Sequence, residues 1–193
     1  MRAAAPPYRG EGPRALWHVS EDPTITHFAP RLRRQQAPTD QPLVWAIDTR
    51  HLPLYWFPRD CPRCTFWASD RTTDADVARF LDGQRSARVH VIEGRWLERV
   101  ATTTLQLYRM PERTFMETPD SAGFWVSREA VDAIERTSVG DLVGRHAAAG
   151  IPLRTVPNVW PLWDAVVAST LEFSGMRLRN ALPHPEEQAP ADP

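Results

Sequence analysis

The chain has 193 residues, of which 42% are hydrophobic and 24% are charged, and its formal net charge is −1. This length and composition suit one globular domain with a hydrophobic core. The near-neutral charge excludes an overall field that would attract a membrane, and it disfavours nucleic acid as a partner, although arginines still allow a local basic face.

No apolar run is long enough to cross a bilayer, so the sequence predicts no transmembrane helix. Residues 1–14 lack the apolar segment of a secretory signal, and two cysteines are too few for a disulfide scaffold. We therefore expect a bacterial cytoplasmic protein with reduced thiols.

Three parts can be distinguished along the chain. Residues 1–14 are rich in proline, glycine and arginine without periodicity, which predicts a flexible arm. Residues 183–193 form a proline-rich acidic segment and predict a disordered tail. Residues 15–182 are expected to form a single domain.

The elements follow from periodicity and from helix start and stop signals. The first part predicts, in chain order, a strand at 15–20, a short extended piece at 25–31, a loop at 32–43 and a strand at 43–48. The middle predicts a strand at 65–69, a helix at 72–83, a strand at 88–93, a helix at 95–103 and a strand at 105–111. The last part predicts a strand at 123–127, a helix at 138–150, a strand at 151–157 and a helix at 160–173.

The order of these elements bears on the fold class. Strands and helices do not alternate regularly, and no glycine-rich turn follows a strand. This favours an α+β fold over a doubly wound nucleotide-binding fold.

The segment YWFPRDCPRC, residues 55–64, holds both cysteines of the chain. Cys61 and Cys64 have the spacing of a zinc ligand pair, but no second pair with a matching spacing follows. A redox pair would need a helix directly after the cysteines, whereas an aromatic, β-branched run follows. The third reading is two small, partly buried thiols, so no metal is expected here.

The same segment offers forked cations on a stiff loop. Arg59 and Arg63 flank Asp60, and Pro58 and Pro62 restrict the backbone. Guanidinium groups in such a loop suit a carboxylate or a phosphate. The alternative is a structural arginine–aspartate pair with one solvated arginine.

His18 and Ser20 lie two residues apart in the first strand, so their side chains share a face. A histidine beside a hydroxyl can hold a sugar diol or polarise a carbonyl, although a lone histidine is more often structural. Glu117 and Asp120 precede the strand at 123–127 and are candidate acids, or simply turn residues.

Two resemblances rest on these residues. The strings LWHVSEDPTITHFAPR, VWAIDTRHLPLYWFPRDCPR, AGFWVS and LEFSGMRLRNA resemble a bacterial family catalogued only as a domain of unknown function, over about residues 15–182. The opening of the body is also similar to small bacterial ADP-ribosyltransferases, in which the first strand carries a histidine and a hydroxyl two residues apart.

The second resemblance implies a split mixed or antiparallel sheet with flanking helices, and NAD as cofactor. By that resemblance His18 and Ser20 would hold the nicotinamide-side ribose, and Tyr55, with Trp56 as competitor, would stack on the nicotinamide. An arginine would hold a phosphate, and the candidates are Arg31, Arg59 and Arg63. Glu117 or Asp120 would stabilise the ribosyl cation, because the strand GFWVS lacks an acid at the position the pattern expects.

Three hypotheses follow. The first is an ADP-ribosyltransferase-like enzyme that binds NAD or a related nucleotide and modifies a small molecule or a macromolecule. The second is an NAD-independent isomerase, cyclase or lyase of a small metabolite, with His18 as general acid or base. The third is a non-catalytic protein that binds a small-molecule ligand in the same cleft.

Overall fold

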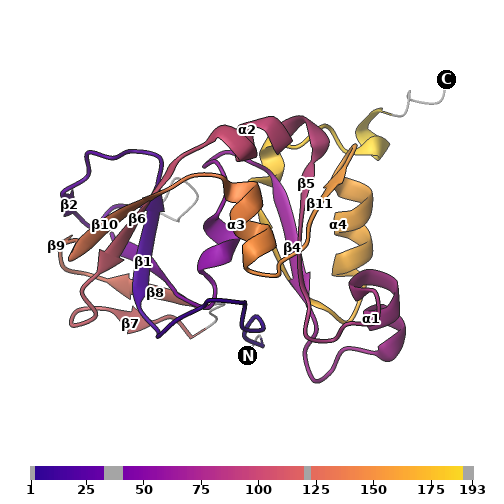
Figure 1. Ribbon diagram of the computed structural model, residues 1–193, viewed down its shortest axis with the longest axis horizontal. Helices are drawn as coiled ribbons and strands as arrows, with labels where there is room; N and C mark the ends of the chain where they lie inside the picture. Colours follow the sequence, from indigo (N-terminus) through magenta and orange to yellow (C-terminus); the bar gives the residue numbers. More distant parts are fainter. Residues whose placement is uncertain (1–2, 33–40, 120–122, 189–193) are drawn as a thin grey trace.

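The computed structural model describes residues 3–32, 41–119 and 123–188 of the chain (Figure 1). Within these ranges, helices and strands are gathered into two main sheets, which confirms the predicted α+β class. The two sheets lie side by side in Figure 1, with helix α3 (Leu142–Ala148) between them. The finer expectation of an ADP-ribosyltransferase-like sheet stays a prediction.

The first sheet has six strands in the spatial order β10-β6-β1-β3-β8-β7, and all its pairings are antiparallel. Its strands in chain order are β1 (Leu16–Ser20), β3 (Val44–Asp48), β6 (Leu105–Met110), β7 (Met116–Glu117), β8 (Phe124–Ser127) and β10 (Glu135–Val139). Strand β1 is central, because β6 pairs with one of its edges and β3 with the other.

The second sheet has four strands in the order β11-β5-β4-β12. Strand β11 runs parallel to β5, and the other pairings are antiparallel. Its strands are β4 (Arg63–Trp67), β5 (Arg88–Glu93), β11 (Leu153–Val156) and β12 (Glu172–Met176). A small third sheet pairs β2 (His27–Phe28) with β9 (Val131–Asp132).

Two helices, α1 (Asp74–Leu81) and α4 (Trp160–Val167), cover one face of the four-stranded sheet. Helix α1 begins where the Thr73 hydroxyl accepts a hydrogen bond of 3.2 Å from the backbone N–H of Asp76. It ends at Asp82, whose φ of 51° is left-handed. Among the described residues, none of the helices is long and apolar enough to cross a membrane.

The space between the two sheets is filled by α3, by α2 (Leu97–Thr102) and by the segment that starts with the 3₁₀ helix η1 (Leu52–Tyr55). One cluster there consists of Ile47, Leu52, Trp56, Leu107, Ala149 and Ile151, and Trp17 and Val19 of β1 pack against it. We call this side of the six-stranded sheet its inner face.

The opposite side of the six-stranded sheet is its outer face. Here Leu16 of β1 packs with Val44 and Tyr108 from the neighbouring strands. Phe28 of β2 and Val131 of β9 complete the cluster, so the small third sheet covers part of the outer face. The alternation along β1 therefore assigns odd and even residues to two separate cores.

Residues 3–14, predicted as a flexible arm, contact the body at several points. The backbone N–H of Ala5 donates to His51 Nε2 at 3.1 Å, and the Trp67 indole donates to the carbonyl of Ala3 at 3.2 Å. The side chain of Ala5 is fully buried. The backbone N–H of Arg9 donates to the carbonyl of Ala149 at 2.9 Å. The division into arm, body and tail stays a prediction.

Several boundaries differ from the predicted ones. The helix expected at 138–150 is limited to α3, because residues 135–139 form the edge strand β10. The helix expected at 160–173 ends at Val167, and β12 follows it. Most of the loop expected at 32–43, positions 33–40, lies outside the described residues.

Candidate functional site

His18 and Ser20 lie on the outer face of β1, half-buried, as the alternation predicted. The Nδ1–H of His18 donates to the carbonyl oxygen of Trp45 at 3.0 Å, because that oxygen can only accept. The ring of His18 lies 4.9 Å from the ring of Phe28, between centroids. These two contacts fix the orientation of the imidazole.

The turn after β1 is held close to this histidine. The Ser20 hydroxyl oxygen accepts a hydrogen bond of 3.1 Å from the backbone N–H of Asp22. Tyr108, which lies directly opposite His18 on β6, donates its hydroxyl to the carbonyl of Asp22 at 2.6 Å. The outer face of β1 thus presents an imidazole and a hydroxyl beside an ordered turn.

Tyr55 is placed elsewhere. It ends η1 and packs with the inner-face cluster, and its ring lies 6.3 Å from that of Phe124. His18 and Tyr55 therefore lie on opposite faces of the six-stranded sheet, and the structure does not bring them together. The reason is that Leu52 and Leu54 are buried and draw η1 into the space between the sheets. Trp56, the competing aromatic residue, is also buried there.

Arg63 is a buried structural cation, only 4% exposed. Its Nε donates to the carbonyl of Leu54 at 2.9 Å and its Nη1 to the carbonyl of Cys61 at 3.0 Å, while its Nη2 lies 2.9 Å from Met176 Sδ. Burial lowers the pKa of Arg63 to about 10. Its guanidinium thus points at backbone carbonyls, and the alternative of a pair with Asp60 is not what holds it.

Arg59 and Arg31 lie at the surface. The backbone N–H of Arg59 donates to the Glu21 carboxylate at 2.6 Å, and the carbonyl of Arg59 accepts from Arg177 Nε at 3.0 Å. Arg31 forms an isolated backbone bridge with Leu43 at the foot of the loop. Arg59 therefore lies at the surface, in the turn before β4, with its backbone bonded to the residue that follows β1, whereas Arg63 is enclosed.

The candidate acids fall in a third place. Glu117 is exposed on β7, the edge strand of the six-stranded sheet, and three strand spacings separate β7 from β1. At ~4.8 Å per spacing, Glu117 lies about 14 Å from the line of His18, which is too far for both to touch one reacting atom. Asp120 lies outside the described residues.

Both cysteines are free, and neither side chain is exposed. Cys61 packs with Phe57 and Ile92 between the sheets, whereas Cys64 packs with α1 and α4 beyond the four-stranded sheet. Burial raises the pKa of each thiol to about 12, so both are protonated. Within the described residues, no group of three or more histidine, cysteine, aspartate or glutamate side chains could hold a metal ion.

A dyad that the sequence reasoning missed is formed by Asp48 and His51. The Nδ1–H of His51 donates to Asp48 Oδ1 at 2.8 Å, and the backbone N–H of His51 donates to the same oxygen at 2.8 Å. Nε2 of His51 then accepts from the arm at Ala5, and the ring is enclosed. The acid three residues before a histidine in VWAIDTRH was the available sequence signal.

A second missed pair, His90 and His146, lies between the sheets. His146 donates its Nδ1–H to the carbonyl of Leu142 at 2.7 Å, so its Nε2 accepts from His90 Nδ1 at 3.0 Å. Burial lowers the pKa of His146 to about 4 and that of His90 well below its usual value. Both rings are neutral at pH 7, and this pair is a structural connection between β5 and α3.

A family model described as "Family of unknown function (DUF6886)" matches residues 17–181. The chain belongs to this family. The DUF6886 match begins in β1 and includes His18, Ser20, Asp48 and His51, whereas the arm up to Arg14 precedes it. No curated protein and no solved structure matches the chain. The family assignment therefore confirms the first resemblance, and the second stays a prediction.

Proposed function

We propose that this DUF6886 protein is an ADP-ribosyltransferase-like enzyme that binds NAD or a related nucleotide on the outer face of β1. The observation that supports the proposal is the placement of His18 and Ser20 side by side on a central strand, with the imidazole oriented by the Trp45 carbonyl. A fixed imidazole next to a hydroxyl suits the two hydroxyls of a ribose.

The proposed site differs from the one expected from the sequence in its other members. Tyr55 and Arg63 are not part of it, because they face the space between the sheets. Arg59 remains a candidate for binding a phosphate. Its backbone N–H bonds the carboxylate of Glu21, which is the residue directly after Ser20. Glu117 is too distant from β1, and Asp120, the other candidate for stabilising the ribosyl cation, lies outside the described residues.

Thermal unfolding with NAD, with ADP-ribose and without nucleotide tests the binding step. A nucleotide at a hundred times its dissociation constant should stabilise the wild type by ~2.7 kcal/mol. His18→Ala and Ser20→Ala should lose this shift. His184→Ala should keep it, because His184 bonds Asp164 of α4, on the far side of the four-stranded sheet. An unshifted wild type at millimolar nucleotide would contradict the proposal.

The distance of Glu117 from His18 favours a second candidate function. In this alternative the same face takes a small metabolite, and His18 acts as a general acid or base without NAD. Release of nicotinamide separates the two candidates. The first predicts release by the wild type and at least ~100-fold slower release by His18→Ala and Asp120→Asn. Nucleotide binding without release would instead indicate a non-catalytic binding protein.

A further inference from the structure

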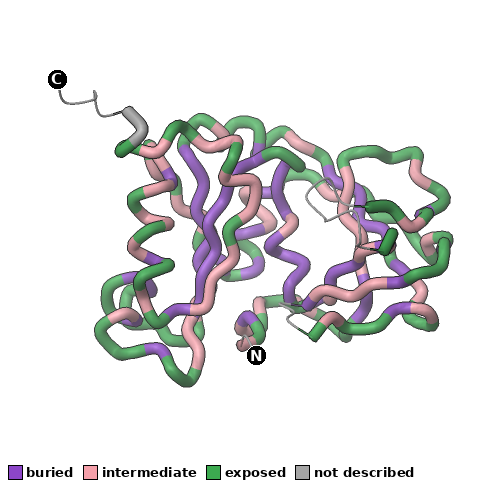
Figure 2. Tube along the Cα trace, turned by 180° about the vertical axis from the view of Figure 1, so that it is seen from behind, coloured by how far each residue is buried: buried purple, intermediate pink, exposed green. Residues whose placement is uncertain are grey.

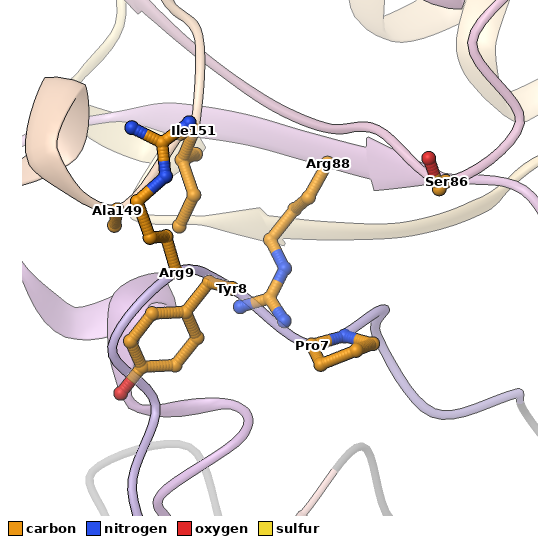
Figure 3. A pocket seen from close by; sticks show the side chains of 8 residues that line it. Pro7, Tyr8, Arg9, Ser86, Arg88, Ala149 and Ile151 are labelled. Carbon is orange, nitrogen blue, oxygen red and sulfur yellow. The ribbon is translucent and has the colours of Figure 1, made fainter.

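A pocket of about 200 Å³ opens between the arm and the body, on the other side of the six-stranded sheet from His18 (Figure 3). Three segments line it: the arm, the start of β5, and the turn between α3 and β11. The lining residues are Pro7, Tyr8, Arg9, Ser86, Arg88, Ala149, Gly150 and Ile151. Two of these side chains are cations and none is an acid.

Arg88 carries a buried positive charge beside this pocket and is 3% exposed. Its Nη1 donates to the carbonyl of Arg50 at 2.9 Å, and its Nη2 donates to the carbonyl of Pro6 in the arm. Its Nε finds no hydrogen-bond partner among the residues that the structure describes. Its guanidinium carbon also lies 5.7 Å from the centroid of the Tyr8 ring. A buried cation held by carbonyl oxygens and a ring is costly, and an anion nearby would lower that cost.

The charges around Arg88 leave this cost largely uncompensated. Glu11 is the acid with the largest electrostatic effect on Arg88. Its carboxylate, however, lies 3.7 Å from Arg50 and accepts a hydrogen bond from the Tyr8 backbone N–H. Asp48 is engaged by His51. Burial therefore dominates and lowers the pKa of Arg88 to about 10.

Arg9 adds the second cation from the opposite wall, where Figure 3 shows its guanidinium next to Ile151. Its Nη2 lies 3.8 Å from the position that a Cβ on Gly150 would take, which places the Arg9 side chain in contact with the turn between α3 and β11. Arg145 also acts on this region, since its charge influences the hydroxyl of Tyr8. The pocket thus lies within a group of arginines.

We propose that this pocket binds a phosphoryl group, as inorganic phosphate or as a small phosphate monoester, between Arg9 and Arg88. Forked guanidinium groups suit phosphoryl oxygens, and the Ser86 hydroxyl supplies a further donor at the rim. The volume of about 200 Å³ is below the ~300 Å³ at which pockets for drug-sized ligands begin, which favours a small anion over a larger ligand. The site is independent of the nucleotide proposed for His18.

The bound anion would also hold the arm. Arg9 belongs to the arm and Arg88 to β5, so a phosphoryl group between them bridges two segments that otherwise meet through a few hydrogen bonds. Binding should therefore slow hydrogen exchange at the backbone N–H groups of Ala5 and Arg9, which bond the body.

Calorimetry and thermal unfolding test the site at constant ionic strength, with chloride, acetate, inorganic phosphate and glycerol 3-phosphate as the probes. Phosphate and the monoester should bind the wild type and raise its melting temperature above that in chloride. Arg9→Ala should weaken binding at least ~10-fold, as expected for losing a charge-assisted contact. The control Arg14→Ala removes an exposed arginine of the same arm, paired with Glu112, and should bind as the wild type does.

Arg88→Gln should abolish binding, and Arg9→Ala keeps the test valid if that variant does not fold. Equal phosphate binding by the wild type and Arg9→Ala would overturn the proposal. So would a shift with acetate as large as that with phosphate, since the site would then select negative charge alone. Slower exchange at Ala5 in the wild type but not in Arg9→Ala would support the bridging role of the anion.

Discussion

The two sheets differ in how far they bury their polar side chains. All residues of β4 and β5 in the four-stranded sheet are buried, whereas β10 in the six-stranded sheet is almost entirely exposed (Figure 2). On the enclosed sheet, Arg63 and Arg88 donate mainly to backbone carbonyls, and His90 bonds another histidine. On the other sheet, His18 and Ser20 are half-exposed beside a turn.

This difference follows from what covers each sheet. Helices α1 and α4 close one face of the four-stranded sheet, and η1 and α3 close the other. Among the described residues, the outer face of the six-stranded sheet is covered by the short strands β2 and β9 and by loop residues such as Phe115. A cation on a strand is therefore a buried structural element in one sheet, while a histidine on a strand of the other sheet is only partly buried.

The largest expected effect is that of Arg63→Ala. The change removes two hydrogen bonds to buried carbonyls and leaves a cavity, so the free energy of unfolding should fall by about 4 kcal/mol. Arg59→Ala, four positions earlier and exposed, should change it by less than about 0.5 kcal/mol. Urea unfolding of both variants measures the difference, and similar midpoints would show that Arg63 is not structural.

The histidine pair gives the enclosed region a pH dependence. The folded pKa of His146 is about 4 and lies below its usual value of 6.5, so the unfolded chain binds more protons between these values. Stability should be complete above pH 6.5 and fall as the pH decreases to 4, by roughly 3 kcal/mol from this residue. His90 acts in the same direction.

Urea unfolding at pH 7 and pH 5 measures this dependence. His146→Gln should be less stable at pH 7 but should show a weaker dependence over the same interval. His184→Ala, which removes a more exposed histidine, should keep the dependence of the wild type. An unchanged slope in His146→Gln would rule out His146 as its source.

Gly123 and Gly83 have similar φ angles, but the first lies at the crowded start of β8 and the second in an open turn. Gly123 has φ +81°, and a Cβ there would lie 2.1 Å from His51 Nδ1. Gly83 has φ +75° and open space around its Cβ position. Gly123→Ala should cost about 3 kcal/mol, through strain and the displaced Asp48–His51 dyad, and Gly83→Ala about 1 kcal/mol. Equal losses of unfolding free energy in the two variants, measured in urea, would mean that the Asp48–His51 dyad can move aside at little cost.

The smallest effect is expected on the accessible side. His18→Ala loses the hydrogen bond to the Trp45 carbonyl and the ring contact with Phe28, so it should lower the free energy of unfolding by about 1 kcal/mol. The loss of nucleotide binding that we propose for this variant should be much larger, relative to the wild type, than its loss of stability. A loss of stability comparable to that of Arg63→Ala would class His18 as structural.

Much of the fold was predictable from local patterns. Strands β1, β3 and β5 and helix α1 have the expected positions, because alternation, apolar runs and a threonine cap are local signals. Strand β12 was not predicted: its first two residues, Glu172 and Phe173, were assigned to the helix expected at 160–173, and they become a strand by pairing with β4. Strand β10 was not predicted either, because its residues pair with residues of β6 that lie 26 to 34 positions earlier in the chain.

The site was only partly predictable. Alternation placed His18 and Ser20 together correctly, because that relation is local to one strand. Sequence spacing could not tell which face of the six-stranded sheet the segment after β3 would reach. That segment enters the space between the sheets, and Tyr55 and Arg63 are therefore not beside His18. The contact between Asp48 and His51 is local, but the partner of the second ring nitrogen of His51 comes from the arm, 46 residues earlier.

The two buried thiols can report when the interior of the protein opens. Cys61 and Cys64 are the two cysteines of the chain and occupy different cores, so a thiol reagent can reach them only after separate parts of the interior have opened. The rates at which each is labelled would therefore time the opening of the space between the sheets and of the helix-covered side separately, without any added probe.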